Sequence, residues 1–249
     1  MAPPPLSPHA HLPHLGAAVA DFAAILETGD LDAPVPGCAP WRLTDLAHHL
    51  GGIHRWARGA VLGDPPDDRE PVDAPTERGA LVAWFRDGAD PLLSTLRDTD
   101  PAAPCWGFGP RPHTAAFWFR RQTHETAAHA GDAAASQGTT RPYGAELALD
   151  GIDETVGVFF PRQVRLGRTA PLPHALAVEA DEGGRWVFAG DGTAWLGGEA
   201  PDRVDGTVSG PAEALLPLLW HRIPLEDSRL SVSGDRHAVE TVLACALAS

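Results

Sequence analysis

The chain has 249 residues, of which 43% are hydrophobic and 21% charged, a composition typical of a folded globular protein with room for one large or two ordinary domains. Its formal net charge of −14 argues against nucleic acid or an anionic membrane as the main partner, because both are themselves negatively charged. Cys38, Cys105 and Cys245 are too widely spaced for a disulfide framework or a paired-cysteine metal motif, so we expect a reducing, cytoplasmic environment. No secretory signal or membrane-spanning run is expected from the sequence.

The first half of the chain has the spacing of a helix bundle. Residues 1–12 are rich in proline and histidine and are expected to form a flexible arm. Apolar residues at helical spacing follow, and Thr114 is expected to cap the last of four helices. The predicted helices cover about 13–28, 42–62, 77–97 and 114–136. Four helices of this length predict a bundle, to which we assign residues 13–145.

The remaining residues, 146–249, change to the alternating pattern of strands. A hairpin is predicted around the turn DEGG. Further strands are predicted in TAWLGG, RVDGTVSG and RLSVSGD, and helices in DGIDETVGVFFPRQV, PAEALLPLLWHR and HAVETVLACALA. This mixture predicts a small α+β domain with an antiparallel sheet.

The segment HETAAHAGDA carries the residues with the clearest chemical potential. Glu125, His129 and Asp132 share one side of the fourth helix, since residues three and four apart are neighbours. A glutamate and a histidine at this spacing can bind one metal ion, although such pairs also occur on solvated faces. His49 lies on the inward stripe of the second helix, where it is either a core histidine bonded to a carbonyl or a ligand. Two histidines and one carboxylate would suit a divalent metal with one position open, and zinc fits such a set best.

Two longer stretches carry a family resemblance. VPGCAPWRLTDLAHHLGGIHRWA and FWFRRQTHETAAHAGDA resemble the signature segments of the mycothiol-dependent maleylpyruvate isomerase family, and LLWHRIPLEDSRLSVSGD is similar to that family's small C-terminal domain. The resemblance implies an α + α/β two-domain fold, with a DinB-like metal-binding four-helix bundle first. It also implies that His49, Glu125 and His129 hold the metal, and that Asp132 and Arg222 hold the cofactor mycothiol.

The resemblance further implies a mechanism in which a metal-bound thiolate attacks an electrophilic small molecule. If the sulfur leaves after bond rotation, the enzyme is a cis–trans isomerase; if it stays, the enzyme is a thiol S-transferase, and the residues alone do not distinguish the two. Two alternatives stay open. One is a thiol-independent DinB-like metalloenzyme of secondary metabolism. The other is a non-catalytic binding or regulatory module stabilised by its metal, which a fourth ligand from His54 or His124 would favour.

Three residues near the proposed ligands have less specific interpretations. Without an evident base nearby, Cys38 is interpreted as a small buried hydrophobe. Arg120 and Arg121 are candidates for surface ion pairs, or for contacts to an acidic substrate or to the cofactor.

Overall fold

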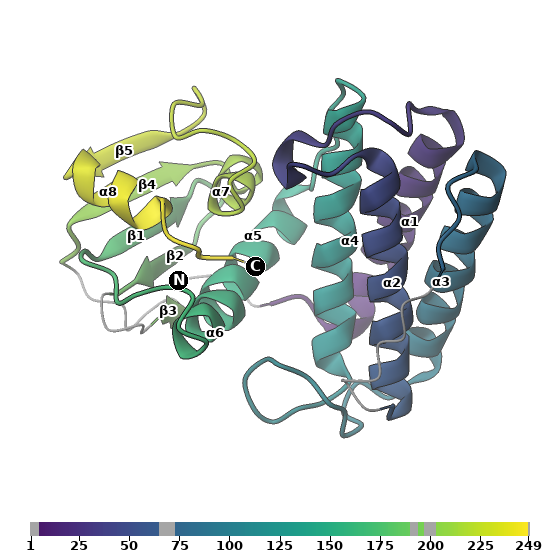
Figure 1. Cartoon of the computed structure of the whole chain (residues 1–249). Helices are drawn as coiled ribbons and strands as arrows, with labels where there is room; N and C mark the ends of the chain where they lie inside the picture. Colours follow the sequence, from purple (N-terminus) through teal and green to yellow (C-terminus); the bar gives the residue numbers. More distant parts are fainter. Residues whose placement is uncertain (1–4, 65–72, 190–193, 197–202, 249) are drawn as a thin grey trace. The chain divides into compact units, whose positions relative to one another are not determined.

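The computed structural model describes residues 5–64, 73–189, 194–196 and 203–248. The chain divides into two compact units, which are described separately: one is Ser7–Pro142, and the other joins Met1–Leu6 to Tyr143–Ser249 (Figure 1). Among the described residues, no helix has both the length and the apolarity needed to cross a lipid bilayer.

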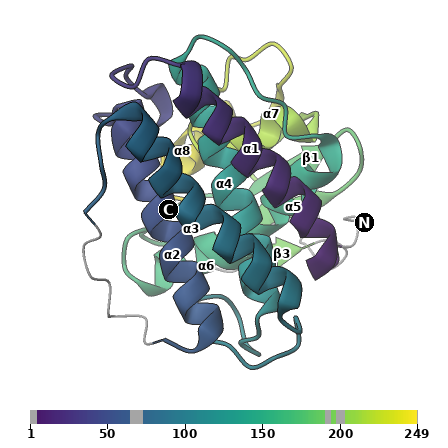
Figure 2. The same cartoon turned by 90° about the vertical axis from the view of Figure 1, so that its right-hand side faces the viewer.

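The N-terminal unit is the predicted four-helix bundle (Figures 1 and 2). Its helices are α1 (His11–Thr28), α2 (Leu43–Leu62), α3 (Arg78–Asp98) and α4 (Ala116–Ser136). Both α1 and α2 pack against α3 and α4, so each helix has two principal neighbours. Helices α2 and α4 are antiparallel, because contacts that advance along α2, from His49 to Trp56, step back along α4, from Glu125 to Trp118.

The bundle core is formed by the apolar stripes that the sequence predicts for the first three helices. Phe22 of α1 and Phe85 of α3 are fully buried, and their ring centroids lie 4.8 Å apart. Leu46 and Leu50 bring the stripe of α2 into the same core. Helix α4 buries Trp118 and Phe119 near its start, but along the rest of its length the buried apolar residues are alanines, among them Ala127. Its inward side could therefore not be identified from hydrophobic periodicity.

Two details at helix starts differ from the sequence expectation. A 3-10 turn at Pro8–Ala10 leads directly into α1, whose first residue, His11, is buried, so helical structure reaches into the expected flexible arm. Proline at the first helical position favours this early start, because its φ is already helical. The cap predicted at Thr114 is wrong: α4 begins at Ala116 with Ala115 as N-cap, and no side chain caps it.

The C-terminal unit is built on a five-stranded sheet. In chain order its strands are β1 (Leu176–Ala180), β2 (Arg185–Phe188), β3 (Ala194–Leu196), β4 (Gly206–Gly210) and β5 (Ser231–Gly234). The predicted hairpin is present, as β1 and β2 pair antiparallel. The sheet order is β3-β2-β1-β4-β5, and β4 runs parallel to β1. The purely antiparallel sheet expected from the sequence is therefore wrong. The sheet is mixed, because the chain crosses from the β3 edge to the far side of β1 before β4 begins.

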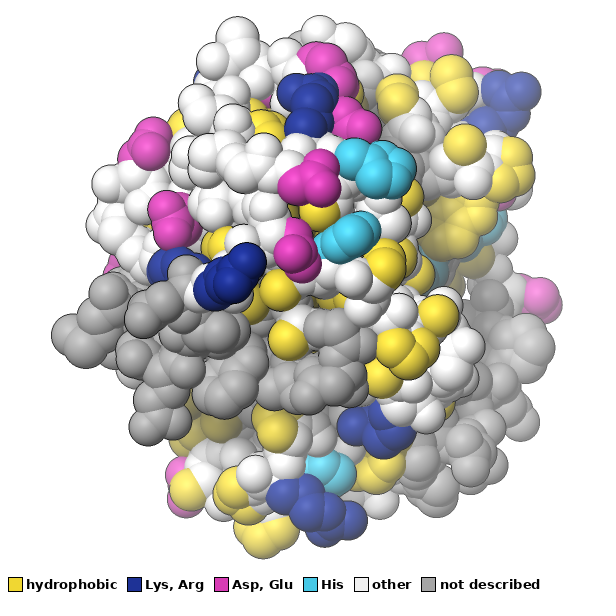
Figure 3. Space-filling view, turned by 90° about the vertical axis from the view of Figure 1, so that its left-hand side faces the viewer, with side chains coloured by type: hydrophobic (Ala, Val, Ile, Leu, Met, Phe, Trp, Pro, Cys, Tyr) yellow, Lys and Arg dark blue, Asp and Glu magenta, His cyan; other side chains and the backbone are white. Residues whose placement is uncertain are grey.

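Helices complete this unit as the sequence predicts. They are α5 (Ala145–Glu154), α6 (Phe160–Arg165), α7 (Ala212–Leu219) and α8 (Arg236–Leu243), with a π-helical turn at Thr155–Phe159 between α5 and α6. The rings of Phe160 and Phe188 meet edge to face at 5.1 Å and join α6 to the sheet. On the face drawn in Figure 3, acidic and basic side chains are interspersed. In the C-terminal unit, Arg236 forms ion pairs with Glu226 and Glu240.

Candidate metal centre

The interface between α2 and α4 brings together the three residues predicted to hold a metal. Helix α2 is fixed at its start by Asp45, whose carboxylate accepts a hydrogen bond from the backbone N–H of Arg42 at 2.8 Å. Less than two turns further on, His49 faces α4. Its Nε2 lies 3.3 Å from Oε1 of Glu125. The same oxygen lies 3.4 Å from Nε2 of His129, which follows Glu125 by one helical turn.

These three side chains form a compact donor set. One ligand atom from each of His49, Glu125 and His129 lies within 4.8 Å of the others. The two imidazole rings are nearly perpendicular, with centroids 5.1 Å apart, so both direct Nε2 at one carboxylate oxygen from different sides. The ring of Trp41 packs against His49 at 4.8 Å and covers its other side.

The electrostatics of the cluster favour bound positive charge. Burial alone would raise the pKa of Glu125, but hydrogen bonds with His129 and His49 and the charge of Arg121 hold it well below its ordinary value. Burial opposes protonation of His129, yet its hydrogen bonds with Asp132, Cys38 and Glu125 raise its pKa well above the ordinary value. A carboxylate that stays ionised between two imidazoles is a site that attracts a proton or a metal cation.

Asp132 acts on the far side of the His129 ring. Its Oδ2 lies 3.0 Å from Nδ1 of His129, so a neutral His129 would keep its proton on Nδ1 and leave Nε2 as a lone-pair donor. The thiol of Cys38, in the 3-10 turn Pro36–Cys38, donates to the same Oδ2 at 3.3 Å. The interpretation of Cys38 as lacking a nearby base is therefore wrong. The sequence offered one hint, since this cysteine lies in the signature loop.

Arg121 is a second residue whose place the sequence did not reveal. Its side chain is 3% exposed, so it is no surface residue, and NH2 donates to Oε2 of Glu125 at 3.1 Å. The two oxygens of Glu125 thus have different neighbours: Oε1 faces the histidines and Oε2 faces the guanidinium.

The other histidines of the bundle lie outside this donor set. His48 points elsewhere, with its Nε2 3.0 Å from the carbonyl oxygen of Pro75. His54 is fully buried with Nε2 2.9 Å from Oγ1 of Thr126, and burial lowers its pKa to about 3. Among the described residues, neither His54 nor His124 joins the ligand atoms around Glu125.

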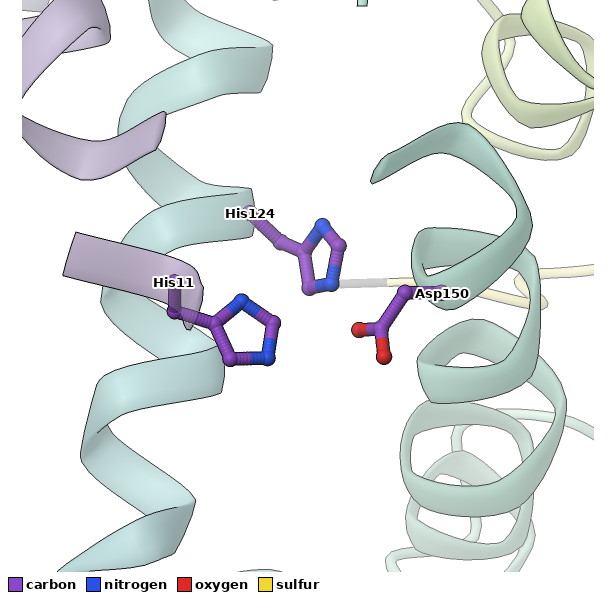
Figure 4. Close-up of side chains that lie close together, drawn as sticks. All are labelled: His11, His124 and Asp150. Carbon is purple, nitrogen blue, oxygen red and sulfur yellow. The ribbon is translucent and has the colours of Figure 1, made fainter. Parts of the chain in front are cut away.

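His124 has a different neighbour within the bundle. Its ring stands edge to face with that of His11 on α1, at 5.8 Å between centroids (Figure 4). Asp150, also drawn in Figure 4, belongs to α5 of the C-terminal unit, where its Oδ2 accepts a hydrogen bond from the backbone N–H of Leu6 at 2.8 Å.

Arg222, the second residue predicted to hold mycothiol, lies directly after α7 in the C-terminal unit. The N–H groups of His221 and Arg222 bond to the carbonyls of Leu218 and Pro217, which is the pattern of a Schellman motif. His221 takes the left-handed position usual for glycine, at φ 57°, and its Nε2 lies 2.7 Å from the carbonyl oxygen of Leu243 on α8. This turn fixes the direction in which the chain presents Arg222.

Arg222 also lines a pocket that lies within the C-terminal unit. The pocket has a volume of about 570 Å³ and is bounded by the end of α7, the segment that follows it and α8. NH1 of Arg222 donates to the carbonyl of Trp220 at 2.6 Å, and the guanidinium lies 5.7 Å from the centre of that indole. The lining combines the guanidinium of Arg222, which can bind oxygen atoms of a ligand, with the carboxylates of Glu226 and Glu240.

Comparisons with known proteins cover most of the chain. Residues 12–134 match the family model described as the mycothiol maleylpyruvate isomerase N-terminal domain, and residues 146–241 match the corresponding C-terminal domain. The crystal structure of the mycothiol-dependent maleylpyruvate isomerase is similar with a TM-score of 0.60 and 13% identity, over 92% of this chain and 93% of that one. A mutant of the mycothiol-dependent maleylpyruvate isomerase gives a TM-score of 0.61 at 12% identity with the same coverage. No curated protein matches the chain in sequence.

Proposed function

Because the chain belongs to the mycothiol maleylpyruvate isomerase family, we propose that it is an enzyme that uses mycothiol and a divalent cation to transform an electrophilic small molecule. The observation that carries the proposal is the convergence of His49, Glu125 and His129 from two helices on one point. Family membership suggests the thiol, and the donor set suggests the cation.

The side chains present fit a divalent cation of the zinc type. Two imidazole nitrogens and one carboxylate oxygen are the ligands that catalytic zinc sites combine with an open position. Asp132 supports this use by holding Nδ1 of His129, the arrangement that orients most metal-binding histidines. When bound there, a divalent cation would supply the positive charge that favours the thiolate form of the cofactor.

Asp132 and Arg222 are the residues we propose for mycothiol. Asp132 lies one turn after His129 on α4, so it is close to any thiol that reaches the cluster. Arg222 offers a planar guanidinium to the oxygen-rich part of a ligand, beside a pocket of about 570 Å³. Asp132 belongs to the N-terminal unit and Arg222 to the C-terminal unit, and each role is proposed from the contacts within that unit.

The expected chemistry is attack of the cofactor sulfur on an electrophilic carbon. With a conjugated cis double bond, the sulfur adds to one of its carbons, and the former double bond can then rotate as a single bond. The carbon–sulfur bond breaks afterwards, which returns the thiol and gives the trans isomer. With a substrate that carries a leaving group, the sulfur displaces that group, which departs with its bonding electron pair, and the carbon–sulfur bond remains in the S-conjugate. The contribution of this chain is to hold both reactants at one place and in one orientation.

The test compares metal and thiol binding in the wild type and in His129→Ala. We expect about one divalent ion per wild-type chain, little in the variant, and cis–trans isomerisation of maleylpyruvate that requires added mycothiol. Equal metal content in the two proteins would contradict the assignment of His129. Turnover by the wild type without any thiol would favour the thiol-independent metalloenzyme.

A further inference from the structure

Arg121 is a buried cation next to the cluster, and none of the proposed roles uses it. Its side chain is only 3% exposed and donates to Oε2 of Glu125 at 3.1 Å. The other oxygen of that carboxylate, Oε1, lies 3.3 Å and 3.4 Å from the Nε2 atoms of His49 and His129. The guanidinium of Arg121 thus lies at one oxygen of the Glu125 carboxylate, and the two imidazoles lie at the other oxygen.

Stability alone explains this pair poorly. An arginine that precedes a glutamate by four residues is the less favourable order for a helix, because the reverse order suits the helix dipole. Burial of an ion pair also costs desolvation energy, which its mutual attraction recovers only in part. Elsewhere the bundle places such a pair in water: Arg86 and Glu27 meet at 3.0 Å with 42% and 48% of their side chains exposed.

We propose that Arg121 is a positioning residue that holds Oε2 of Glu125, so that the carboxylate offers only Oε1 to a cation shared with His49 and His129. The inference rests on the proposed function, since it concerns a cation at this cluster. A carboxylate can bind a cation through one oxygen or through both. If both bound, the second oxygen would take the position that a catalytic site leaves for its thiol or substrate.

The positive charge of Arg121 has a second consequence for the same site. When both imidazoles are neutral, the donor set carries the single negative charge of Glu125, and the guanidinium of Arg121 lies 3.1 Å from that carboxylate and offsets part of its charge. The charge of a bound cation then remains available to act on a thiol, instead of being partly cancelled by its ligands. Both effects keep the site open and electrophilic.

The experiment loads the full-length protein with Co²⁺, whose visible absorption weakens as its coordination number rises. Arg121→Gln removes the positive charge and the guanidinium N–H donors, whereas Arg121→Lys retains a charged donor. Arg86→Gln is the matched control, because it breaks an exposed Arg–Glu pair of the same bundle. Each protein is titrated with Co²⁺, then with mycothiol, and its thermal unfolding is followed by circular dichroism.

We expect the Co²⁺ bands of Arg121→Gln to be weaker by about twofold and no longer to respond to mycothiol, because Oε2 fills the open position. Arg121→Lys and Arg86→Gln should keep the wild-type spectrum and its response. An unchanged spectrum and response in Arg121→Gln would overturn the inference. So would a lower melting temperature with loss of Co²⁺ in both Arg121 variants, since the pair would then be structural. If the wild type itself takes up no Co²⁺, the proposed function fails first.

Discussion

Two histidines of α2, only five residues apart, meet different partners on α4. His49 lies at the half-exposed end of the interface, with Nε2 3.3 Å from a carboxylate oxygen of Glu125. His54 lies in the fully buried part of the interface, with Nε2 2.9 Å from the hydroxyl of Thr126, and burial lowers its pKa to about 3. Adjacent residues of α4, Glu125 and Thr126, therefore decide which histidine can share a cation and which remains neutral.

A histidine at a helix–helix interface therefore has no fixed role. Helix α2 buries His54 but leaves His49 half-exposed, so the two histidines differ in burial as well as in partner. The partner across the interface separates them, because a carboxylate favours bound positive charge and a hydroxyl does not compensate for desolvation.

The first prediction concerns the neighbours His48 and His49. His49→Ala removes one of the three proposed ligands, and we expect the affinity for divalent metal to fall by more than about a hundredfold, since even residues that only support a ligand contribute 10–100-fold. His48→Ala should leave metal affinity unchanged, because that ring lies beside the carbonyl of Pro75. Competition with a coloured chelator measures both variants. Equal losses would show that the effect is structural.

The second prediction concerns Asp132. Asp132→Asn keeps the shape of the side chain but removes the charge that holds Nδ1 of His129 at 3.0 Å. We expect metal affinity to fall by about 10–100-fold. Asp98→Asn, a change at an exposed residue near the end of α3, is the control. If metal affinity holds and only mycothiol binding weakens, then Asp132 serves the cofactor and does not support His129.

The third prediction concerns acid stability and His54. In the folded protein its pKa is about 3, whereas an unfolded histidine titrates near its ordinary value of 6.5. Between these values the unfolded chain binds the extra proton, so stability is fully present above 6.5 and is lost as the pH falls toward 3, at about 1.4 kcal/mol per pH unit.

We expect His54→Gln to remove this part of the pH dependence. Glutamine can still bond to Thr126 but does not titrate. Urea unfolding of the metal-free wild type and variant, at several pH values between 7 and 5, gives the difference in slope, and groups common to both proteins cancel. Parallel pH profiles would mean that His54 is protonated or hydrated in the folded protein.

The sequence predicted what depends on local spacing. Helical periodicity identified the first three long helices, and the turn DEGG placed the β1–β2 hairpin. The parallel pairing of β1 with β4 was missed, because strand alternation shows which residues face the core and does not show which strand lies alongside. Pairing between distant segments leaves no periodic signal in one sequence.

The same limit applied to the cluster. The residues that share a helix face, Glu125, His129 and Asp132, could be grouped from their spacing alone. His49 was a candidate ligand from its place on the inward stripe of α2, and the family resemblance then assigned it to the same metal, since nothing local tells which helix lies opposite α2. The burial of Arg121, which excludes a surface ion pair, could not be inferred because α4 has no apolar stripe. Cys38 is 94 residues from Asp132, its partner.

The fourth prediction uses Cys38 to measure how far the cluster extends. Its thiol donates to Oδ2 of Asp132 at 3.3 Å, and such a bond contributes about 0.5–1 kcal/mol. Cys38→Ala should therefore weaken metal binding by only about two- to fivefold. Cys38→Ser, which keeps a donor, should bind as the wild type does. Cys38, His129 and Asp132 also form a group of possible ligand atoms within 4.8 Å of one another. If metal affinity falls as much in Cys38→Ala as in His49→Ala, the sulfur binds the cation directly, and Cys38 is a ligand instead of a supporting residue.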